Sequence, residues 1–510
     1  MNRGQTPLAT ASPVTSSSTP PHSPGRLLEP LLSDLSRPGR RGFHLPKLDV
    51  PLRKPEELIP ADLIRKEPAF LPELSERDLV KHFMRLAHLN FSAETNFYPL
   101  GSCTMKYNPK VNEEIANLAG FAKVHPYAPE EQVQGILGLL VELEQLFKEI
   151  LGMDAVTLQP AAGAQGELTA LLMARAYHVA QGSPRRKVVI PDSAHGTNPA
   201  SAALCGFEVV EVASTRRGRA SLEQLTHAVT DDIAVFMMTN PNTLGLFEEE
   251  VLQIAEYVHR KGGLMYLDGA NLNALLGLIR PGDIGFDMVH VNIHKTFSIP
   301  HGSGGPGGGP VGVKSALKPF LPGPIVVQRE GIYRLDSPGP HSIGRVRTFL
   351  GNVGALIRGY AYIRALGKEG LKRVSEGAIL NANYLKALVR EIFPIQVDEP
   401  CMHEFIATAK ELKSATGVRA LDIAKRLLDY GFYAPTIYFP LIVEEALMIE
   451  PTETESRETL EGFAQALKRI VQEAKENAER VKSAPHRMPV TRLDEVQAAR
   501  EPNLRWSHSG

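Results

Sequence analysis

The sequence predicts an α/β protein with a large, mostly parallel sheet domain and a smaller C-terminal α+β domain. From about residue 153 to 313, short apolar runs bounded by turn residues alternate with segments of helical periodicity. This alternation is typical of a parallel sheet covered by helices on both faces. After about residue 345 the pattern becomes mainly helical, with fewer strands, and this change predicts the second domain.

Composition restricts the class of protein. The chain has 510 residues, of which 43% are hydrophobic and 22% charged, as in globular proteins of more than one domain. A net charge of −1 argues against a nucleic-acid binder, and no apolar run approaches the ~20 residues that span a bilayer. Three scattered cysteines without a CxxC pair favour a reduced, cytoplasmic setting.

Changes of composition divide the chain into five expected segments. Residues 1–28 contain no acidic residue and are rich in Ser, Thr and Pro. They favour a disordered tail over a targeting peptide, which would be richer in Arg and amphipathic. The expected segments are a tail (1–40), an N-terminal arm with helices (41–120), the large α/β domain (121–345), the C-terminal α+β domain (346–485) and an extension (486–510).

The individual elements follow from periodicity and capping signals. Ser75, followed by Asp78 and an apolar run, predicts a helix start. Apolar residues at helical spacing predict further helices at 133–151, 251–261, 355–392, 419–430 and 456–482. Short β-branched or apolar runs predict strands at 187–191, 233–238, 264–267 and 288–293.

Polar side chains follow each of these four strands. Because ligands bind beyond the carboxyl ends of the strands in an open α/β sheet, we expect these side chains to converge on one pocket. They include an imidazole, an amide, a carboxylate and an amine, which in chain order are His195, Asn240, Asp268 and Lys295.

This set fits the chemistry of pyridoxal phosphate (PLP). The cofactor's aldehyde needs an amine, which assigns the Schiff base to Lys295, and its pyridine nitrogen needs a carboxylate, which assigns Asp268. A flat partner, His195, would stack on the ring. The phosphate needs backbone N–H groups at a helix start, and the turn Gly163–Gly166 before a helical segment supplies them.

Each of these residues also has a structural interpretation when taken alone. Lys295 could lie on the surface, Asp268 could cap a helix, His195 could be a satisfied loop histidine, and Gly163–Gly166 could be a plain turn. Their shared position at one sheet edge favours the functional interpretation. The Gly-rich run 301–313 fails as a dinucleotide fingerprint because prolines interrupt it and no helix pattern follows; we expect a pliable loop beside Lys295.

Seven long motifs carry a resemblance to a known family. They are YPLGSCTMKYNPK (98–110), QPAAGAQGELT (159–169), PDSAHGTNPASAA (191–203), TNPNTLGLFE (239–248), DGANLNA (268–274), HKTFSIPHGSGGPG (294–307) and PTIYFPLIVEEALMIEPTETES (435–456). They resemble the glycine cleavage system P-proteins, the decarboxylating glycine dehydrogenases, from roughly residue 45 to 507. Their order and extent correspond to the C-terminal half of the P-protein, which many prokaryotes encode separately as subunit 2. The N-terminal tail departs from the pattern.

The resemblance implies a PLP-dependent transferase of fold type I, the aspartate-aminotransferase type, and carries roles to individual residues. Lys295 falls on the Schiff-base lysine, Asp268 would pair with the pyridinium and His195 would stack on the ring. The remaining cofactor contacts are Ala164 and Gln165 for the phosphate, Asn240 or Asn242 for the ring hydroxyl, and His294 and Thr296 for the phosphate and the imine.

The implied reaction is decarboxylation of glycine, with transfer of the remaining aminomethyl group to the lipoyl arm of H-protein. Subunit 1 would complete a heterotetramer of two copies of each subunit, and no metal is expected. Arg345 or Arg347 could hold the glycine carboxylate, as could a residue of the other subunit. Cys103 could have a redox role, although a structural cysteine is favoured because no second cysteine is close in sequence.

Two alternatives stay open from the residues. One is another PLP enzyme of the same fold, such as a threonine aldolase or a cysteine desulfurase; the latter needs a reactive thiol, and Cys401 has no evident cation nearby in sequence. The other is an inactive scaffold subunit, against which the presence of both Asp268 and Lys295 argues.

Overall fold

The computed structural model describes residues 29–505 apart from 68, 70 and 302–306. The described residues form two compact units, one from the ranges 1–90 and 488–510 and the other from 91–487. Much of the expected tail, residues 1–28, lies outside the described residues. None of the helices in the described ranges is both long and apolar enough to cross a bilayer.

The first unit is built around helix α2 (Glu76–His88), whose start is capped as the sequence predicts. The hydroxyl of Ser75 accepts a hydrogen bond from the backbone N–H of Asp78. The unit also contains short helices at α1 (Leu32–Leu35), η1 (Pro55–Glu57) and α15 (Glu495–Arg500). Its segment from residue 43 to 71 carries large apolar side chains that are mostly exposed, including Phe43, Leu45 and Leu52.

A seven-stranded sheet forms the centre of the second unit, in the order β1-β7-β6-β5-β4-β2-β3. Strands β2 to β6 pair in parallel with one another, and β7 pairs antiparallel with both β1 and β6. The strand bounds are β1 (Ala155–Thr157), β2 (Lys187–Pro191), β3 (Glu208–Val212), β4 (Ile233–Thr239), β5 (Leu264–Gly269), β6 (Met288–Val291) and β7 (Val311–Val313). The mostly parallel sheet predicted from the sequence is confirmed.

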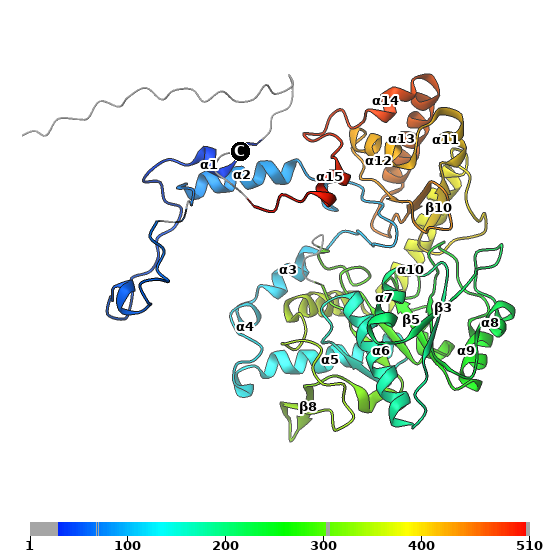
Figure 1. Ribbon diagram of the computed structural model, residues 1–510, viewed down its shortest axis with the longest axis horizontal. Coiled ribbons are helices and arrows are strands. Elements are labelled where there is room, and N and C mark those ends of the chain that lie inside the picture. Colours follow the sequence, from blue (N-terminus) through cyan, green and yellow to red (C-terminus); the bar gives the residue numbers. More distant parts are fainter. Residues whose placement is uncertain (1–28, 68, 70, 302–306, 506–510) are drawn as a thin grey trace, which may run out of the picture. The chain divides into compact units, whose positions relative to one another are not determined.

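Alternate residues of the strands enter two separate cores, because side chains along a strand point to opposite faces. Val188 and Tyr266 pack on one face with apolar residues of α6 (Gly163–Ala180) and α7 (Thr197–Leu204). Val189 and Met265 pack on the other face with α5 (Gln134–Leu151), α8 (Leu222–Ala228), α9 (Val251–Arg260) and α10 (Val353–Val389). Figure 1 shows α6 and α7 on one side of the strands and α8 and α9 on the other. Both faces are therefore covered.

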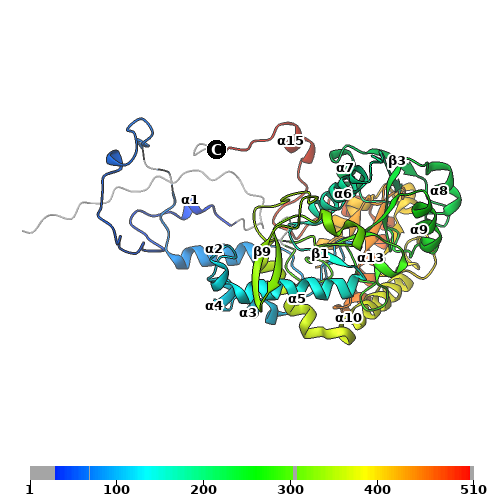
Figure 2. The ribbon, with the colours of Figure 1, turned by 90° about the horizontal axis from the view of Figure 1, so that it is seen from below.

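Shorter elements complete the large domain. Helices α3 (Lys110–Ala116) and α4 (Ala119–Ala122) precede α5, and the short turns η2 (Glu130–Gln132), η3 (Pro281–Ile284) and η4 (Ser315–Phe320) join longer elements. The hairpin of β8 (Ile325–Arg329) and β9 (Ile332–Asp336) lies alongside α5 (Figure 2).

The C-terminal part has its own sheet and core, as expected for an α+β domain. Three antiparallel strands pair in the order β10-β12-β11, with bounds Phe405–Thr408 (β10), Thr436–Ile437 (β11) and Ala446–Ile449 (β12). The covering helices are α11 (Lys410–Thr416), α12 (Ala420–Asp429), α13 (Arg457–Glu476) and α14 (Ala478–Lys482). Helix α10 leads into this domain and is interrupted at Gly367, where φ is +60°.

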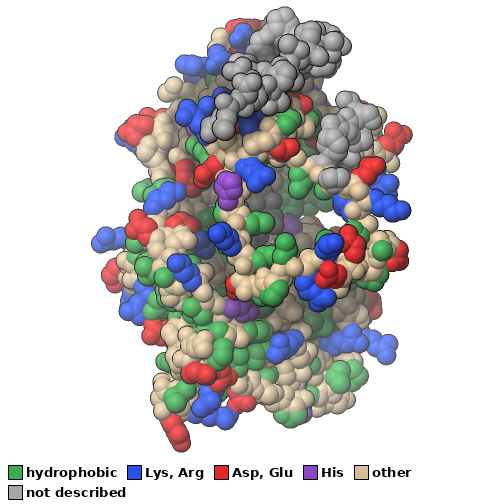
Figure 3. All heavy atoms as spheres, turned by 90° about the vertical axis from the view of Figure 1, so that its left-hand side faces the viewer, with side chains coloured by type: hydrophobic (Ala, Val, Ile, Leu, Met, Phe, Trp, Pro, Cys, Tyr) green, Lys and Arg blue, Asp and Glu red, His purple; other side chains and the backbone are tan. Residues whose placement is uncertain are grey.

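Charged side chains of both signs are interspersed on the face that Figure 3 shows, in keeping with the net charge of −1.

Candidate active site

A cavity of about 330 Å³ lies where the carboxyl ends of β2, β4, β5 and β6 meet. Its lining combines residues that follow these strands with the first turn of α6 and with two segments distant in sequence, one before the sheet and one in the C-terminal domain. The main polar lining residues are Ser102, Cys103, Glu167, His195, Thr239, Asp268, Asn292, His294, Lys295, His301, His403 and Glu404.

Lys295 lies in the turn after β6 with its amine at the cavity. Its Nζ donates a hydrogen bond to the backbone carbonyl of Ser102, at 2.7 Å. Ser102 has a φ of +60°, a backbone conformation uncommon for a residue with a side chain, and its N–H donates to a carboxyl oxygen of Glu404 at 2.7 Å. A buried glutamate of the C-terminal domain therefore holds the loop on which the lysine rests.

Asp268 lies near the end of β5 and is only 5% exposed. Its Oδ1 accepts a hydrogen bond from the N–H of Ala270 at 3.0 Å and lies 3.6 Å from Nε2 of His290. The side-chain amide of Asn198 is assigned the orientation that places its nitrogen toward the surrounding acceptors, and in this orientation the nitrogen donates to Oδ2 of Asp268 at 3.2 Å. The carboxylate is thus buried and oriented from both sides, as a charged group that must face a ligand requires.

His195 follows β2 and lines the same cavity. Its Nδ1 lies 2.9 Å from the hydroxyl of Thr197, and its ring meets Phe439 edge-on at 5.7 Å between centroids. Burial lowers the pKa of His195, outweighing the opposite effect of Asp268. The ring is therefore neutral at physiological pH.

The first turn of α6 brings backbone N–H groups to the cavity, where Gly163 and Ala164 are lining residues. A helix start of this kind binds anions such as phosphate. The side chain of Gln165 points elsewhere, because it accepts from the N–H of Ala161 and donates to the carbonyl of Val346. Gln165 can contribute to an anion site here only through its backbone.

The two asparagines after β4 differ in how fully they are bonded. Asn242 is engaged at both ends, donating to Gly218 and Glu248 and accepting from backbone N–H groups. Asn240 accepts from the N–H of Glu248, while its buried Nδ2 has no partner among the described residues. Only Asn240 thus has a free donor for a ligand, although its side chain is not among those lining the cavity.

His294 and Thr296 flank Lys295 in sequence but differ in position. The hydroxyl of Thr296 accepts from the N–H of Leu272 at 2.8 Å, which ties the loops after β5 and β6 together. His294 lines the cavity, with its ring 5.2 Å from that of His301. Burial, with Lys295 as the second cause, lowers the pKa of His294 to about 3.

Several buried polar atoms around the cavity lack a partner among the described residues. They include the hydroxyl of Thr239 and Oδ1 of Asn292, which both belong to lining residues. Buried polar atoms are usually bonded, so these positions suit a polar ligand. An amine, a buried carboxylate, a neutral imidazole and a helix start are the groups that PLP needs, and the cavity fits this cofactor.

Sequence reasoning missed the acidic groups around the cavity. Glu167, Glu404 and Glu450 are buried, and burial, first among the causes, raises the pKa of each carboxyl above its ordinary range. Glu167 could have been noticed as a charged residue amid apolar neighbours one turn into the predicted helix. Glu404 and Glu450 belong to another domain and gave no local signal.

The two arginines proposed for the glycine carboxylate lie outside the cavity lining. Arg345 is exposed and its Nη1 lies 3.4 Å from the hydroxyl of Tyr127. Nη1 of Arg347 is buried without a partner among the described residues. The lining contains the amine of Lys295, whereas burial lowers the pKa of each of its histidines, His195, His294, His301 and His403.

Cys103 lines the cavity, with its sulfur 3.0 Å from Nε2 of His301. Burial is the main cause that raises the pKa of its thiol, so the sulfur is protonated. Residues 302–306 of the expected pliable loop lie outside the described residues. Of the glycines that follow, Gly309 packs so closely that a Cβ would come within 2.2 Å of the carbonyl of Ala162, which keeps the loop against the start of α6.

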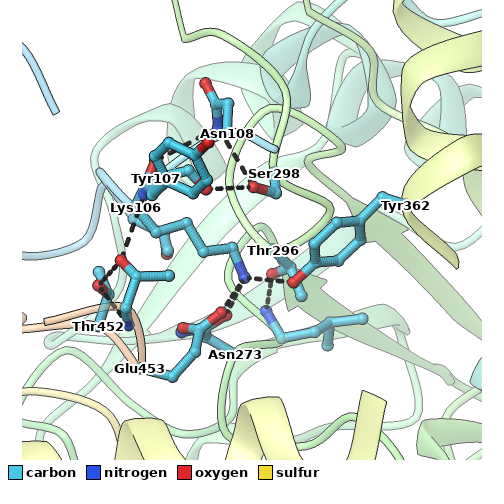
Figure 4. A network of polar contacts seen from close by, with 12 residues as sticks. Lys106, Tyr107, Asn108, Asn273, Thr296, Ser298, Tyr362, Thr452 and Glu453 are labelled. Atoms are coloured by element: carbon cyan, nitrogen blue, oxygen red, sulfur yellow. Dashed lines mark hydrogen bonds and ion pairs between the residues drawn. The ribbon is translucent and has the colours of Figure 1, made fainter. Parts of the chain in front are cut away.

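Beside the cavity, a second lysine is fully enclosed by partners (Figure 4). The side chain of Lys106 is 1% exposed, and its Nζ lies 2.8 Å from Glu453, 2.9 Å from Asn273 and 3.3 Å from Tyr362. Burial acts to lower its pKa, but attraction to Glu453 and Tyr362 outweighs it and the pKa is raised. The network ties residues 104–108 to the loop after β5, to α10 and to the loop after β12.

The sequence of the chain is similar to that of a known protein family. Residues 53–333 match the family described as glycine cleavage system P-protein, and residues 374–490 match the glycine dehydrogenase C-terminal domain. The chain is 56% identical over 481 residues to a probable glycine dehydrogenase (decarboxylating) subunit 2 of Desulforamulus reducens, covering 94% of this chain and 99% of the relative. It is 57% identical over 473 residues to the protein of that description from Chlorobium chlorochromatii, covering 93% and 98%.

Solved structures show the same fold. A crystal structure of glycine decarboxylase (P-protein) in inhibitor-bound form superposes with a TM-score of 0.69 at 23% identity, covering 82% of this chain and 95% of that one. Glutamate decarboxylase of Lactobacillus brevis gives a TM-score of 0.63 at 14% identity, covering 81% and 96%. The fold is therefore that of the fold type I, PLP-dependent enzymes.

Proposed function

The chain belongs to the glycine cleavage system P-protein family, and from this premise we propose that it binds PLP through Lys295 and decarboxylates glycine in that cavity. Its activity is that of a decarboxylating glycine dehydrogenase. The observation that carries the assignment of Lys295 is the placement of its amine and the Asp268 carboxylate at the ends of neighbouring parallel strands, in one cavity with the start of α6. When bound, PLP supplies an electron sink for the bond to the departing carboxyl group.

The residues of the chain would hold the cofactor and the substrate as follows. Asp268, buried and oriented by Ala270 and Asn198, would keep the pyridine nitrogen protonated. His195 would lie against the ring, and the first N–H groups of α6, at Ala164 and Gln165, would receive the phosphate. Asn240 would donate its free Nδ2 to the ring hydroxyl.

Lys295 would hold the cofactor through its Nζ and, when that amine is free, would take and return protons there. The carbonyl of Ser102 accepts from this amine now and would hold it near the cavity after its release. His294 and Thr296 stay secondary candidates, His294 at the cavity wall and Thr296 through the loop it fixes. No metal is needed for this chemistry.

Cys401 weighs against a cysteine desulfurase activity. It is 3% exposed, and burial raises the pKa of its thiol to about 12. A desulfurase needs a mobile cysteine that ionises readily. A buried, protonated thiol of this kind suits a structural role.

Borohydride reduction tests the cofactor assignment directly. Reduction of the PLP-loaded protein should fix the label on the peptide that contains Lys295, because only a Schiff base is reduced to a stable amine. Lys295→Ala should leave that peptide unlabelled. Lys106→Met, a change at the neighbouring enclosed lysine, should leave the label on the Lys295 peptide in place. A label on another lysine in the wild-type protein would contradict the assignment.

The aminomethyl group would pass to the lipoyl arm of H-protein, and subunit 1 would complete a heterotetramer with two copies of each chain. The exposed apolar side chains of the segment from residue 43 to 71 support a protein partner, since Phe43, Leu45 and Leu52 are 74%, 85% and 86% exposed. A soluble complex of this kind is consistent with a cytoplasmic location.

Replacing Phe43, Leu45 and Leu52 together with serine should weaken assembly with subunit 1. Size-exclusion chromatography with light scattering would measure the complex. Serine at Leu204 and Leu380, which are 77% and 69% exposed on other elements, is the matched control. Assembly that is unchanged by the triple substitution would show that this segment does not bind subunit 1.

A further inference from the structure

Glu167 lies one turn into α6 and faces the first turns of α7. Its side chain is 4% exposed and reaches the cavity wall. Its Oε1 lies 2.8 Å from the hydroxyl of Thr197, and its Oε2 lies 3.3 Å from the hydroxyl of Ser201. In the orientation assigned above to the Asn198 amide, Oε2 also lies 2.9 Å from its side-chain nitrogen. None of the roles assigned above uses this carboxyl group.

Two of its partners connect Glu167 to the residues that face the cofactor. Oγ1 of Thr197 is 2.9 Å from Nδ1 of His195, and the nitrogen of Asn198 that reaches Glu167 also lies 3.2 Å from Oδ2 of Asp268. The Glu167 carboxyl group is therefore linked to His195 through one intervening side chain, Thr197, and to Asp268 through another, Asn198.

The directions of these hydrogen bonds locate a proton. The backbone N–H of Thr197 donates to Nδ1 of His195 at 3.2 Å, so this ring nitrogen carries a lone pair and no hydrogen. Oγ1 of Thr197 lies 2.9 Å from this nitrogen and 2.8 Å from Oε1 of Glu167, and each contact is short enough to need a hydrogen between its two atoms. Because Nδ1 has no hydrogen to give, the hydrogen of the Thr197 hydroxyl lies in the contact with His195. Because a hydroxyl has one hydrogen, Oγ1 can only accept from Glu167, and Glu167 must carry the hydrogen.

We propose that Glu167 is a positioning residue that acts as a neutral carboxylic acid, fixing the tautomer of His195 through Thr197 and the orientation of Asp268 through Asn198. The second oxygen of a neutral acid is a carbonyl acceptor, as the donors Asn198 and Ser201 require. His195 then carries its hydrogen on Nε2.

The electrostatics support a neutral Glu167. Burial is the main cause that raises its pKa, and repulsion by Asp268, one amide group away, is the second; Lys295 acts in the opposite direction. Tyr266, which interacts with Glu167, has a pKa raised well above its ordinary value, chiefly by burial, and is uncharged; His195 is neutral as well. A neutral Glu167 therefore adds no second negative charge beside Asp268 at the position expected for the pyridine nitrogen. The role of Glu167 in the reaction rests on the proposed function.

The test compares Glu167→Gln with Glu167→Ala. A glutamine amide can donate to Thr197 and accept from Asn198 and Ser201, so it reproduces a neutral acid, whereas it cannot replace a carboxylate that only accepts. Glu248 offers a matched control: it is 1% exposed after β4, accepts from Asn242 and the N–H of Ala220, and contacts neither His195 nor Asp268 among the contacts of the described residues.

The first measurement needs neither cofactor nor activity. Nitrogen-15 NMR of histidine-labelled, PLP-free protein, with His195 assigned by its loss in His195→Gln, should show Nδ1 without and Nε2 with hydrogen. This pattern should persist in Glu167→Gln, Glu248→Gln and Glu248→Ala and be lost in Glu167→Ala. A hydrogen on Nδ1 in the wild-type protein, or loss of the pattern in Glu167→Gln, would overturn the proposal.

The second measurement uses glycine–CO₂ exchange by the complex with subunit 1 and lipoylated H-protein. Glu167→Ala should lower kcat roughly 10- to 100-fold, the usual effect of removing a partner that orients a site residue, and Glu167→Gln should recover most of it. Equal losses in both variants would refute a neutral acid. Absence of exchange in the wild-type complex would instead count against the proposed function, leaving the NMR result to decide on Glu167.

Discussion

Two lysines in neighbouring parts of the molecule have opposite surroundings. Lys106 has three partners within 3.3 Å and a side chain that is 1% exposed. Lys295 donates to one backbone carbonyl beside a cavity of about 330 Å³. A buried charge whose hydrogen bonds are all made fixes structure, whereas an amine with free capacity beside a cavity is available for chemistry.

The largest expected difference between the two lysines concerns catalysis. Lys295→Ala should lower glycine–CO₂ exchange by at least about 10³-fold, within the range for loss of a positioned acid–base group. Its urea midpoint should stay close to that of the wild type, because one hydrogen bond to a carbonyl contributes only about 1 kcal/mol. Exchange at the wild-type rate would show that Lys295 is not the catalytic lysine.

Lys106 should show the converse behaviour, with a large effect on stability. Lys106→Met leaves Glu453, only 11% exposed, without its cation, and breaking a buried ion pair in this way costs about 3–5 kcal/mol. Urea denaturation would measure the loss. Adding Glu453→Leu should restore part of it, since the unpaired charge is then removed; a single variant as stable as the wild type would mean that the network is not a structural clamp.

The carboxyl groups near Lys295 should make stability depend on pH, unlike the ion pair at Lys106. Burial raises the pKa of Glu404 and of Glu450 above the ordinary value of 4.5, and the charge of Glu450 adds to the effect on Glu404. The folded chain then holds protons that the unfolded chain releases, so this stabilisation is complete below pH 4.5 and is lost as pH rises through the raised values.

Urea denaturation at about pH 5 and about pH 8 would measure this loss. Glu404→Gln should reduce the difference in unfolding free energy between the two pH values. Lys106→Met should lower both values by a similar amount. If Glu404→Gln leaves the pH dependence of stability unchanged, other groups must cause that dependence.

Cys103 should show the smallest effect. Its thiol is kept protonated by burial, so Cys103→Ser should change exchange by no more than about threefold, equivalent to less than 1 kcal/mol. A much larger loss would indicate that the sulfur takes part in the reaction, as the redox hypothesis requires. Cys401→Ser, at a buried cysteine outside the cavity, is the control.

The local pattern of apolar and polar residues predicted those helices and strands whose conformation is determined mainly by their own residues. Strand β2 has the expected bounds, since an uninterrupted apolar run fills a buried strand. Strand β3 was missed because its sequence, EVVEV, is mostly exposed at the sheet edge, and β7 because its three residues follow glycines and a proline. Short or exposed strands are stabilised mainly by pairing with neighbouring strands. The sequence of one segment alone does not show which strand it will pair with.

The same distinction applies to the cavity. Residues that follow a strand could be predicted to converge, and His195, Asp268 and Lys295 do line one cavity. The presence of Glu404 and Ser102 at the cavity could not be predicted, because these residues belong to chain segments about three hundred positions apart. Their role depends on the packing of the C-terminal domain, which apolar periodicity alone does not specify.

The long sequence separation within the Lys106 network has a consequence for synthesis of the chain on the ribosome. Lys106 and Glu453 are 347 positions apart, so at about 5–20 residues per second the lysine waits roughly 17–70 s for its counter-ion to be made. During that interval Lys106 can reach Asn273 and Tyr362 once these are made, but not the carboxylate that pairs with its charge. The cavity wall formed by Glu404 is also made late, so the nascent chain cannot complete the cavity until translation is nearly finished, and a ligand of the cavity would bind after that point.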